Sequence, residues 1–296
     1  MGPLARLIDP ELLTRLDQLA LSARSVVAGV NIGLHRSPVR GASVEFRQHR
    51  AYTPGDEIRR LDWRVLGRTD RTYIREFDEE TDLRVMLMLD CSGSMGYGQG
   101  ATRKLDHAVR LCAAVGYVLL SRAESVGLAQ FDERIRQWLE PRSGAKQMAA
   151  MIDLLERAAP SRRGVLAPAS DEVARRLGRR SLVMIVSDLL CPSDAAREAI
   201  LHLRHRKHEV IVARVLHADE LEFPFQSWHR FRGLEGEPAA ICEPAVMREA
   251  YLREFREHDR QIAQAAQSAG ADYLTLRAGG DLFQAVSDIV RRRQAE

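Results

Sequence analysis

A short apolar segment that ends in an acid and two hydroxyl groups constrains this chain more than any other stretch. Residues Val85–Leu89 are all apolar, and Asp90-Cys-Ser92-Gly-Ser94 follows them directly. The run is too short to cross a membrane and is typical of a strand buried on both faces. Several glycines and an apolar-periodic stretch over about residues 102–122 come next, which predicts a helix. We therefore expect the acid and hydroxyls on a strand-to-helix turn, at the carboxyl end of a parallel strand, where ligands bind in open sheets.

The spacing Asp-x-Ser-x-Ser favours a hard metal ion, because one carboxylate (Asp90) and two hydroxyls (Ser92 and Ser94) are ligands that a partly hydrated Mg²⁺ accepts. The stretch lacks the G-x-S-x-G of a nucleophile elbow, the Gly-Lys-Ser/Thr end of a P-loop and the third glycine of a dinucleotide loop, where Arg103 stands. An aspartyl-phosphate enzyme would use Asp90 as its nucleophile, but Ser92 replaces the usual second aspartate. A turn whose serines only cap the next helix explains this stretch as well as a metal site does.

A second apolar segment also ends in an aspartate. The apolar residues Leu182–Val186 are followed by Ser187 and then Asp188, and Pro192-Ser-Asp is typical of the start of a helix. Because the carboxyl ends of parallel strands meet at one edge of a sheet, two carboxylates are expected to lie together there.

With these two motifs the chain resembles the von Willebrand factor A fold and its metal-ion-dependent adhesion site. Val165 stands where that family has a threonine, so we expect weak binding of a divalent cation, Mg²⁺ ahead of Mn²⁺ or Ca²⁺. Ser161 is the candidate for a replacement hydroxyl. The resemblance implies the metal ligands Asp90, Ser92, Ser94 and Asp188.

A motif in the N-terminal part is dense in arginine, aspartate and aromatic residues. Two explanations remain open: an internal network of ion pairs that holds an irregular segment, which physical arguments favour, or a surface that grips a partner. Its residues are Arg50, Tyr52, Gly55, Asp56, Arg59, Asp62 and Trp63. Their arrangement resembles the motif of the bacterial family called domain of unknown function 58, in which it also directly precedes the von Willebrand A-like strand.

Composition narrows the classes of partner. The chain has 44 lysines and arginines against 41 acids, and a net charge of +3 is too small to indicate nucleic acid or a membrane surface. Its four cysteines show no C-x-x-C spacing and fit a reducing compartment, and the N-terminus has no apolar signal core. We expect a cytoplasmic protein without nucleic-acid binding or membrane insertion.

The predicted architecture is α/β, with 45% hydrophobic residues among 296 to supply the core. A doubly wound, mostly parallel sheet of the von Willebrand factor A type is expected over residues 82–296. An N-terminal α+β extension that carries the arginine-rich motif is expected over residues 1–81. Strands at Val126–Phe131 and Arg134–Leu139 have no helix between them, which predicts one antiparallel edge strand.

The family resemblance also implies a function. Members are typically encoded beside MoxR-type AAA+ ATPases and are thought to act with them in assembly, maturation or metal insertion of a client protein. This implies a metal-dependent protein-binding adaptor that is not itself an enzyme. The alternative is a metal-dependent hydrolase that uses Asp90 and Asp188 around one ion, although the motifs supply no histidine or glutamate at a fixed spacing as a general base.

Overall fold

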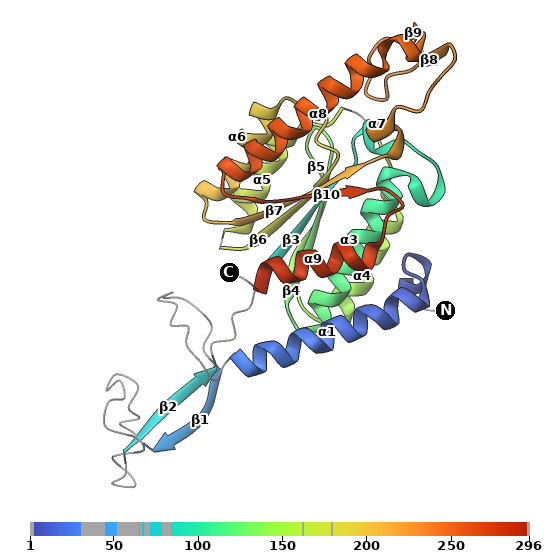
Figure 1. The fold of residues 1–296 in the computed structure, drawn as a ribbon. Coiled ribbons are helices and arrows are strands. Elements are labelled where there is room, and N and C mark those ends of the chain that lie inside the picture. Colours follow the sequence, from blue (N-terminus) through green and yellow to red (C-terminus); the bar gives the residue numbers. More distant parts are fainter. Residues whose placement is uncertain are drawn as a thin grey trace. The chain divides into compact units, whose positions relative to one another are not determined.

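The computed structural model describes residues 3–30, 45–51, 65, 67, 72–78, 84–161, 163–178 and 180–294 (Figure 1). The chain divides into two compact units, one formed by Met1–Gly29 with Leu83–Glu296 and one by Val30–Asp82. The larger unit contains the central sheet, and the smaller one contains a two-stranded hairpin.

Strands and helices alternate along most of the larger unit. Its strands are β3 (Arg84–Asp90), β4 (Ser125–Phe131), β5 (Ile135–Arg142), β6 (Leu182–Ser187), β7 (Glu209–Leu216), β8 (His229–Phe231), β9 (Ala240–Cys242) and β10 (Asp272–Arg277). Its helices are η1 (Pro3–Arg6), α1 (Pro10–Val30), η3 (Gly93–Gly96), η4 (Gly100–Thr102), α3 (Lys104–Ser121), α4 (Ala145–Glu156), α5 (Leu166–Leu177), α6 (Ser193–His205), α7 (Ala218–Glu222), α8 (Pro244–Ser268) and α9 (Leu282–Gln294).

The central sheet has six strands in the order β10-β7-β6-β3-β4-β5. Neighbouring strands are parallel except β4 and β5, which are antiparallel. Residues 132–134 alone join β4 to β5, and so short a connection can link only antiparallel neighbours. The predicted edge strand and the predicted α/β sheet of the von Willebrand factor A type are confirmed.

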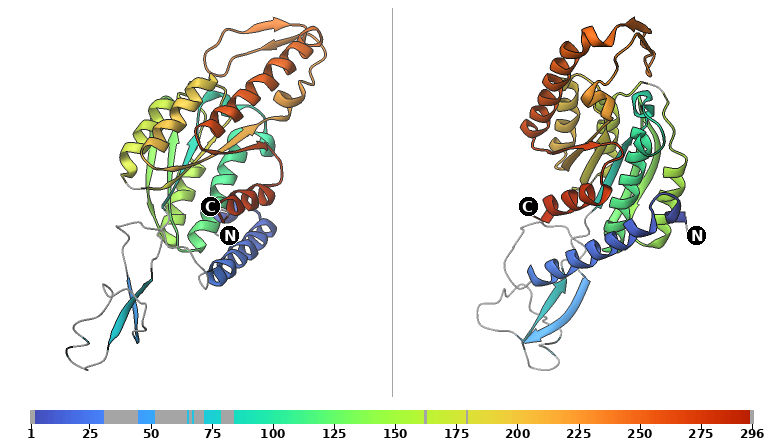
Figure 2. Two further views of the ribbon diagram at one scale, coloured as in Figure 1. Left: turned by 60° about the vertical axis from the view of Figure 1, so that its left-hand side comes forward. Right: turned by 45° about the vertical axis from the view of Figure 1, so that its right-hand side comes forward.

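Helices cover both faces of the sheet, which explains why β3 and β6 are apolar on both faces (Figure 2). Alternate residues of β3 enter different cores: Leu87 and Leu89 pack in the core of α1, α3, α4 and α9, whereas Met86 and Met88 pack in the core of α5, α6 and α8. Burying one such side chain contributes about 1.5 to 3 kcal/mol. The two apolar cores fix the middle strands, and with them the sheet edge at which β3 and β6 end.

The first helix belongs to the larger unit. Ile8, Leu12, Leu16 and Ala20 are buried in the same core as α3 and α9. Asp9 caps the helix by accepting a hydrogen bond from the Leu12 N–H at 2.8 Å. The expected extension over residues 1–81 is therefore divided between the two units, because the apolar stripe of α1 packs in the core of the sheet domain.

The smaller unit contains strands β1 (Glu45–Ala51) and β2 (Tyr73–Asp78), which pair antiparallel with an irregularity between Phe46 and Gln48. Among the residues that the structure describes, no helix is long and apolar enough to cross a membrane.

His107 on α3 is buried, and its Nδ1 accepts a hydrogen bond from the Gly279 N–H at 3.2 Å. Burial, with a smaller effect of the Arg110 charge, lowers the pKa of His107 from 6.5 to about 4. The unfolded chain therefore binds a proton more readily, and we expect stability to fall by about 2 to 3 kcal/mol as the pH drops through this range. Denaturant unfolding at a series of pH values gives the free energy of unfolding as a function of pH. This free energy should depend less on pH in His107→Asn than in the wild type, and the exposed control His205→Asn should behave as the wild type. The same pH dependence of stability in all three proteins would show that His107 is not its cause.

Candidate functional site

The two predicted acidic strand ends lie side by side. Strands β3 and β6 are parallel neighbours with Leu89 opposite Val186, so Asp90 and Ser187 end adjacent strands. A small cavity of about 20 Å³ is present at this edge, which is enough for about one water molecule or ion. Its lining includes all four predicted ligands, Asp90, Ser92, Ser94 and Asp188.

Asp90 is buried and is held by two hydrogen bonds. Its Oδ2 accepts from the Ser187 hydroxyl at 2.5 Å, and its Oδ1 accepts from the Ser92 N–H at 2.8 Å. Burial and the neighbouring charge of Asp188 raise the pKa of Asp90 to about 7, against the opposing effect of these hydrogen bonds. The chain thus holds a carboxyl group whose charged form would be stabilised by a cation in the cavity.

The two serines of the motif do not serve as helix caps. Ser92 precedes η3 but makes no side-chain capping bond, and α3 starts after Arg103. Instead, the hydroxyls of Ser92 and Ser94 lie 3.1 Å apart and form a hydrogen bond with each other. The capping interpretation is therefore wrong, and both hydroxyl oxygens are presented at the cavity beside Asp90.

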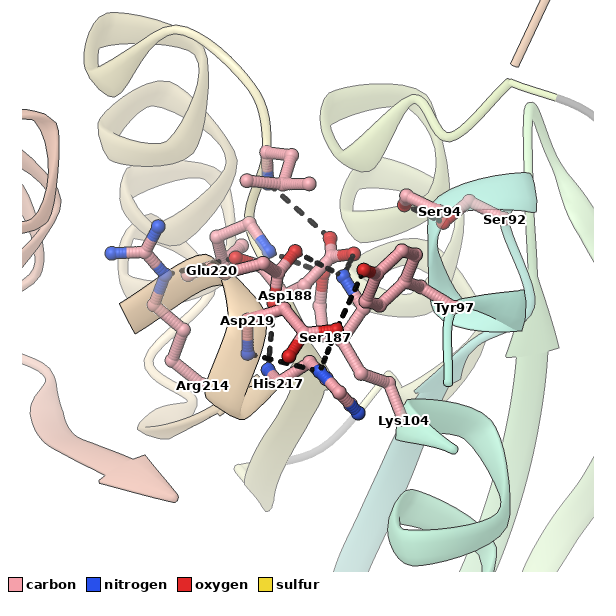
Figure 3. A network of polar contacts seen from close by, with 12 residues as sticks. Ser92, Ser94, Tyr97, Lys104, Ser187, Asp188, Arg214, His217, Asp219 and Glu220 are labelled. Atoms are coloured by element: carbon pink, nitrogen blue, oxygen red, sulfur yellow. Dashed lines mark hydrogen bonds and ion pairs between the residues drawn. The ribbon is translucent and has the colours of Figure 1, made fainter. Parts of the chain in front are cut away.

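A lysine that sequence reasoning missed lies beside the second acid (Figure 3). The Lys104 ammonium group donates to Asp188 Oδ2 and to Glu220 Oε1, both at 2.7 Å. The side chains of Lys104 and Asp188 are only 1% and 2% exposed. Burial disfavours the charged lysine, but the two carboxylates outweigh it, so its pKa is raised. Part of the negative charge at the sheet edge is therefore already balanced by an internal cation.

Arg214 fixes the turn that carries Asp188. Its side chain is fully buried, and Nε donates to the Asp188 carbonyl at 2.8 Å. The same guanidinium group donates to Asp259 Oδ1 at 2.6 Å, which ties the turn to α8. Charge-assisted hydrogen bonds of this kind are about twice as strong as neutral ones. The position of Asp188 is thus set by β7 and α8 as well as by its own strand.

The middle loop lacks the hydroxyl that the family resemblance calls for. The side chain of Val165 is exposed, and its N–H donates to the Asp132 carbonyl. The Ser161 hydroxyl donates to Asp132 Oδ2 at 2.5 Å, and Ser161 is not among the described residues that line the cavity. The Ser161 hydroxyl thus points to Asp132 in this structure, so nothing in the lining of the cavity supports it as a replacement ligand.

A glutamate from a distant hairpin completes the site. Glu235 lies in the connection between β8 and β9, and its Oε1 accepts from the Ser94 N–H at 3.2 Å. Its Oε2 accepts from the Gly164 N–H, also at 3.2 Å. A Cβ atom on Gly164 would lie 2.8 Å from Ser92 Cβ, so only glycine allows this loop to approach the motif so closely. Glu235 lines the same cavity as the four predicted ligands.

The donor set fits a hydrated divalent cation. Asp90, Ser92 and Ser94 offer oxygen atoms, and three carboxyl groups line a cavity of the size of one ion, which suits Mg²⁺ or Mn²⁺. Within the described part of the chain, no three His, Cys, Asp or Glu side chains form a ready-made metal cluster. The Lys104 ammonium group also neutralises part of the negative charge of Asp188. These features fit an ion that keeps several water ligands and binds weakly.

Most of the arginine-rich motif lies outside the described residues. Arg50 is in β1, opposite Ile74 of β2. The other motif residues, Tyr52, Gly55, Asp56, Arg59, Asp62 and Trp63, have no described placement, so both explanations of the motif remain predictions.

Four residues of the site were not expected from sequence: Lys104, Glu220, Glu235 and Ser187 acting through its hydroxyl. For one of them, Lys104, the sequence contains a feature that points to the site. Lys104 is the first residue of α3, where the helix dipole disfavours a cation, so a lysine there indicates acidic partners nearby. Glu235 carried no such signal, because it is 141 residues from Ser94 and lies in an irregular connection.

Comparisons with known proteins agree with this architecture. The family model described as protein of unknown function DUF58 matches residues 48–261. The uncharacterized protein Rv1480 of Mycobacterium tuberculosis is 29% identical over 287 residues, which are 96% of this chain and 89% of that protein.

Solved structures with similar folds include the conserved hypothetical protein BatB of Bacteroides thetaiotaomicron. It has a TM-score of 0.50 at 17% identity, with 72% of this chain and 100% of that chain covered. The VWA domain of SpRpn10 gives a TM-score of 0.41 at 9% identity, with 70% and 94% covered.

Proposed function

The chain belongs to the DUF58 family and has a fold of the von Willebrand factor A type, and from this premise we propose that it is a protein-binding adaptor whose contact surface is the Asp90 edge of the sheet. The partner that the family resemblance implies is a MoxR-type AAA+ ATPase, which would act on a client during assembly, maturation or metal insertion. A divalent cation held by Asp90, Ser92 and Ser94 would contribute to the contact.

The observation that supports this proposal is the distribution of exposed apolar side chains. Large hydrophobic residues are usually buried, and a group of exposed ones is typical of a protein-binding surface. Among the side chains that the structure describes, the exposed large hydrophobics all come from loops at the carboxyl edge of the sheet, the β8–β9 hairpin segment or the start of α8. They are Val165, Leu190, Trp228, Leu234, Ile241, Val246 and Met247.

An apolar hollow adjoins the acidic cavity. It has a volume of about 180 Å³, and Ser94 and Leu190 line both spaces. Its lining includes three phenylalanines, two tyrosines and two leucines, and the charged residues Lys104, Asp219 and Glu220 also lie along it. A partner could therefore place an apolar side chain in the hollow and an acidic one at the neighbouring cation, which is the combination of anchor and polar contact found at protein interfaces.

A hydrolase is supported less well by the same site. Enzymes of that class need a general base near the attacked bond, and no histidine is among the described residues that line the cavity. Glu235 could serve as a base in principle, but its two oxygens accept hydrogen bonds from backbone N–H groups. A panel of phosphoester and peptide substrates separates the two functions, because turnover that disappears in Asp90→Asn would contradict the adaptor.

Divalent cations should bind weakly. With Val165 offering no hydroxyl and Lys104 paired with Asp188, we expect a dissociation constant for Mg²⁺ on the order of 0.1 to 1 mM, the weak end of protein sites. Isothermal titration calorimetry measures this directly, with Asp90→Asn as the variant that loses binding. Micromolar or tighter binding by the wild type would show that the set of ligands is incomplete.

A further inference from the structure

The backbone around the cavity forms a receptor for a carboxylate group. The N–H groups of Ser94 and Gly164 come from two different loops, yet they bind the two oxygens of one carboxylate, each at 3.2 Å. Paired N–H donors of this kind recognise an anion by geometry as well as by charge. The group that they bind in this structure is Glu235, an acid of the same chain.

The segment that carries Glu235 is firmly held at its base. Phe231 of β8 packs against Phe225 with ring centroids 5.3 Å apart, and Phe223 stacks on Tyr251 of α8 at 4.3 Å. Beyond this aromatic base, residues 232–239 form an exposed tip that reaches the site through Leu234 and Glu235. These aromatic contacts hold the base of the segment, and Leu234 and Glu235 reach the motif beyond it.

The contact between the tip and the motif is close. A Cβ atom on Gly93 would lie 2.1 Å from the Leu234 carbonyl oxygen, so the glycine is required for the tip to sit where it does. Leu234 itself is exposed and lines the apolar hollow beside the cavity. One short segment of the chain thus covers the acidic cavity with Glu235 and occupies the edge of the hollow with Leu234.

We propose that Glu235 is an internal competitor of the partner protein. Its carboxylate occupies the position that an acidic side chain of the partner takes on binding. This inference rests on the proposed adaptor function for the identity of the partner, but the carboxylate site itself does not depend on it. The tip of residues 232–239 would have to swing away before the partner binds, and the isolated chain would be held in a low-affinity state.

Acetate is the probe for the vacated site. In Glu235→Ala, without divalent cations, titration with acetate should give saturable shifts of the Ser94 and Gly164 amide resonances. The wild type and the exposed control Glu243→Ala should require at least tenfold more acetate, because Glu235 competes at an effective concentration that is high within one chain. An equal response of wild type and Glu235→Ala would overturn the proposal.

Two further arms keep the outcomes distinct. Gly93→Ala retains the Glu235 carboxylate but displaces the tip, so it replaces Glu235→Ala if that variant does not fold, with the same expected response.

In the second arm, Glu235→Ala should bind the ATPase about tenfold more tightly than the wild type, and equal affinities would overturn the competition. Absence of ATPase binding to both proteins would contradict the adaptor function, while the acetate titration would still decide on the carboxylate site.

Discussion

Replacing Lys104 by methionine is expected to lower the free energy of unfolding by about 3 to 5 kcal/mol. The ammonium group is buried between Asp188 and Glu220, and removal of one partner leaves the carboxylates without their cation. Methionine keeps most of the volume of the lysine stem, so the effect reports the charge rather than a cavity. Denaturant unfolding measures the change.

Lys146→Met is the matched control, because Lys146 is exposed on α4 and its replacement should change stability by less than about 0.5 kcal/mol. Mg²⁺ at millimolar concentration should stabilise Lys104→Met more than the wild type, because a divalent cation can then take over the charge of Asp188. Equal stability of Lys104→Met and Lys146→Met would show that the buried ion pair contributes nothing.

Replacing Asp90 by asparagine should weaken association with the ATPase by about 2 to 5 kcal/mol, a factor of about 30 or more. Asparagine removes the charge but keeps a side-chain oxygen that can accept the Ser92 N–H. Because burial already disfavours the charged carboxyl of Asp90, the fold should be retained. Denaturant unfolding and circular dichroism of the variant check this. If the variant does not fold, its loss of ATPase binding cannot be assigned to the contact surface.

The sheet and its acidic edge could be predicted because local patterns determine them. The apolar runs of β3 and β6 end in Asp90 and Asp188, and parallel pairing alone brings those ends together. The short connection after β4 likewise allowed only an antiparallel edge strand.

The rest of the site depends on contacts between distant segments. Asp188 meets Lys104 across 84 residues, and Ser94 meets Glu235 across 141. Nothing in the sequence near Glu235 indicates that an irregular connection folds back onto the motif. In the same way, only the tertiary structure shows that Leu12 and Leu16 of α1 pack in the core of the sheet domain.

The most direct test of the adaptor function is the affinity of the MoxR-type ATPase for this chain, measured with Mg²⁺ and with EDTA. Wild type should bind at least about 30-fold more tightly with Mg²⁺, and Asp90→Asn should bind weakly in both conditions. Asp153→Asn, an exposed position on α4, should behave as the wild type. Wild-type binding that is equally tight in Mg²⁺ and EDTA and unchanged in Asp90→Asn would contradict a metal-dependent contact at this edge of the sheet.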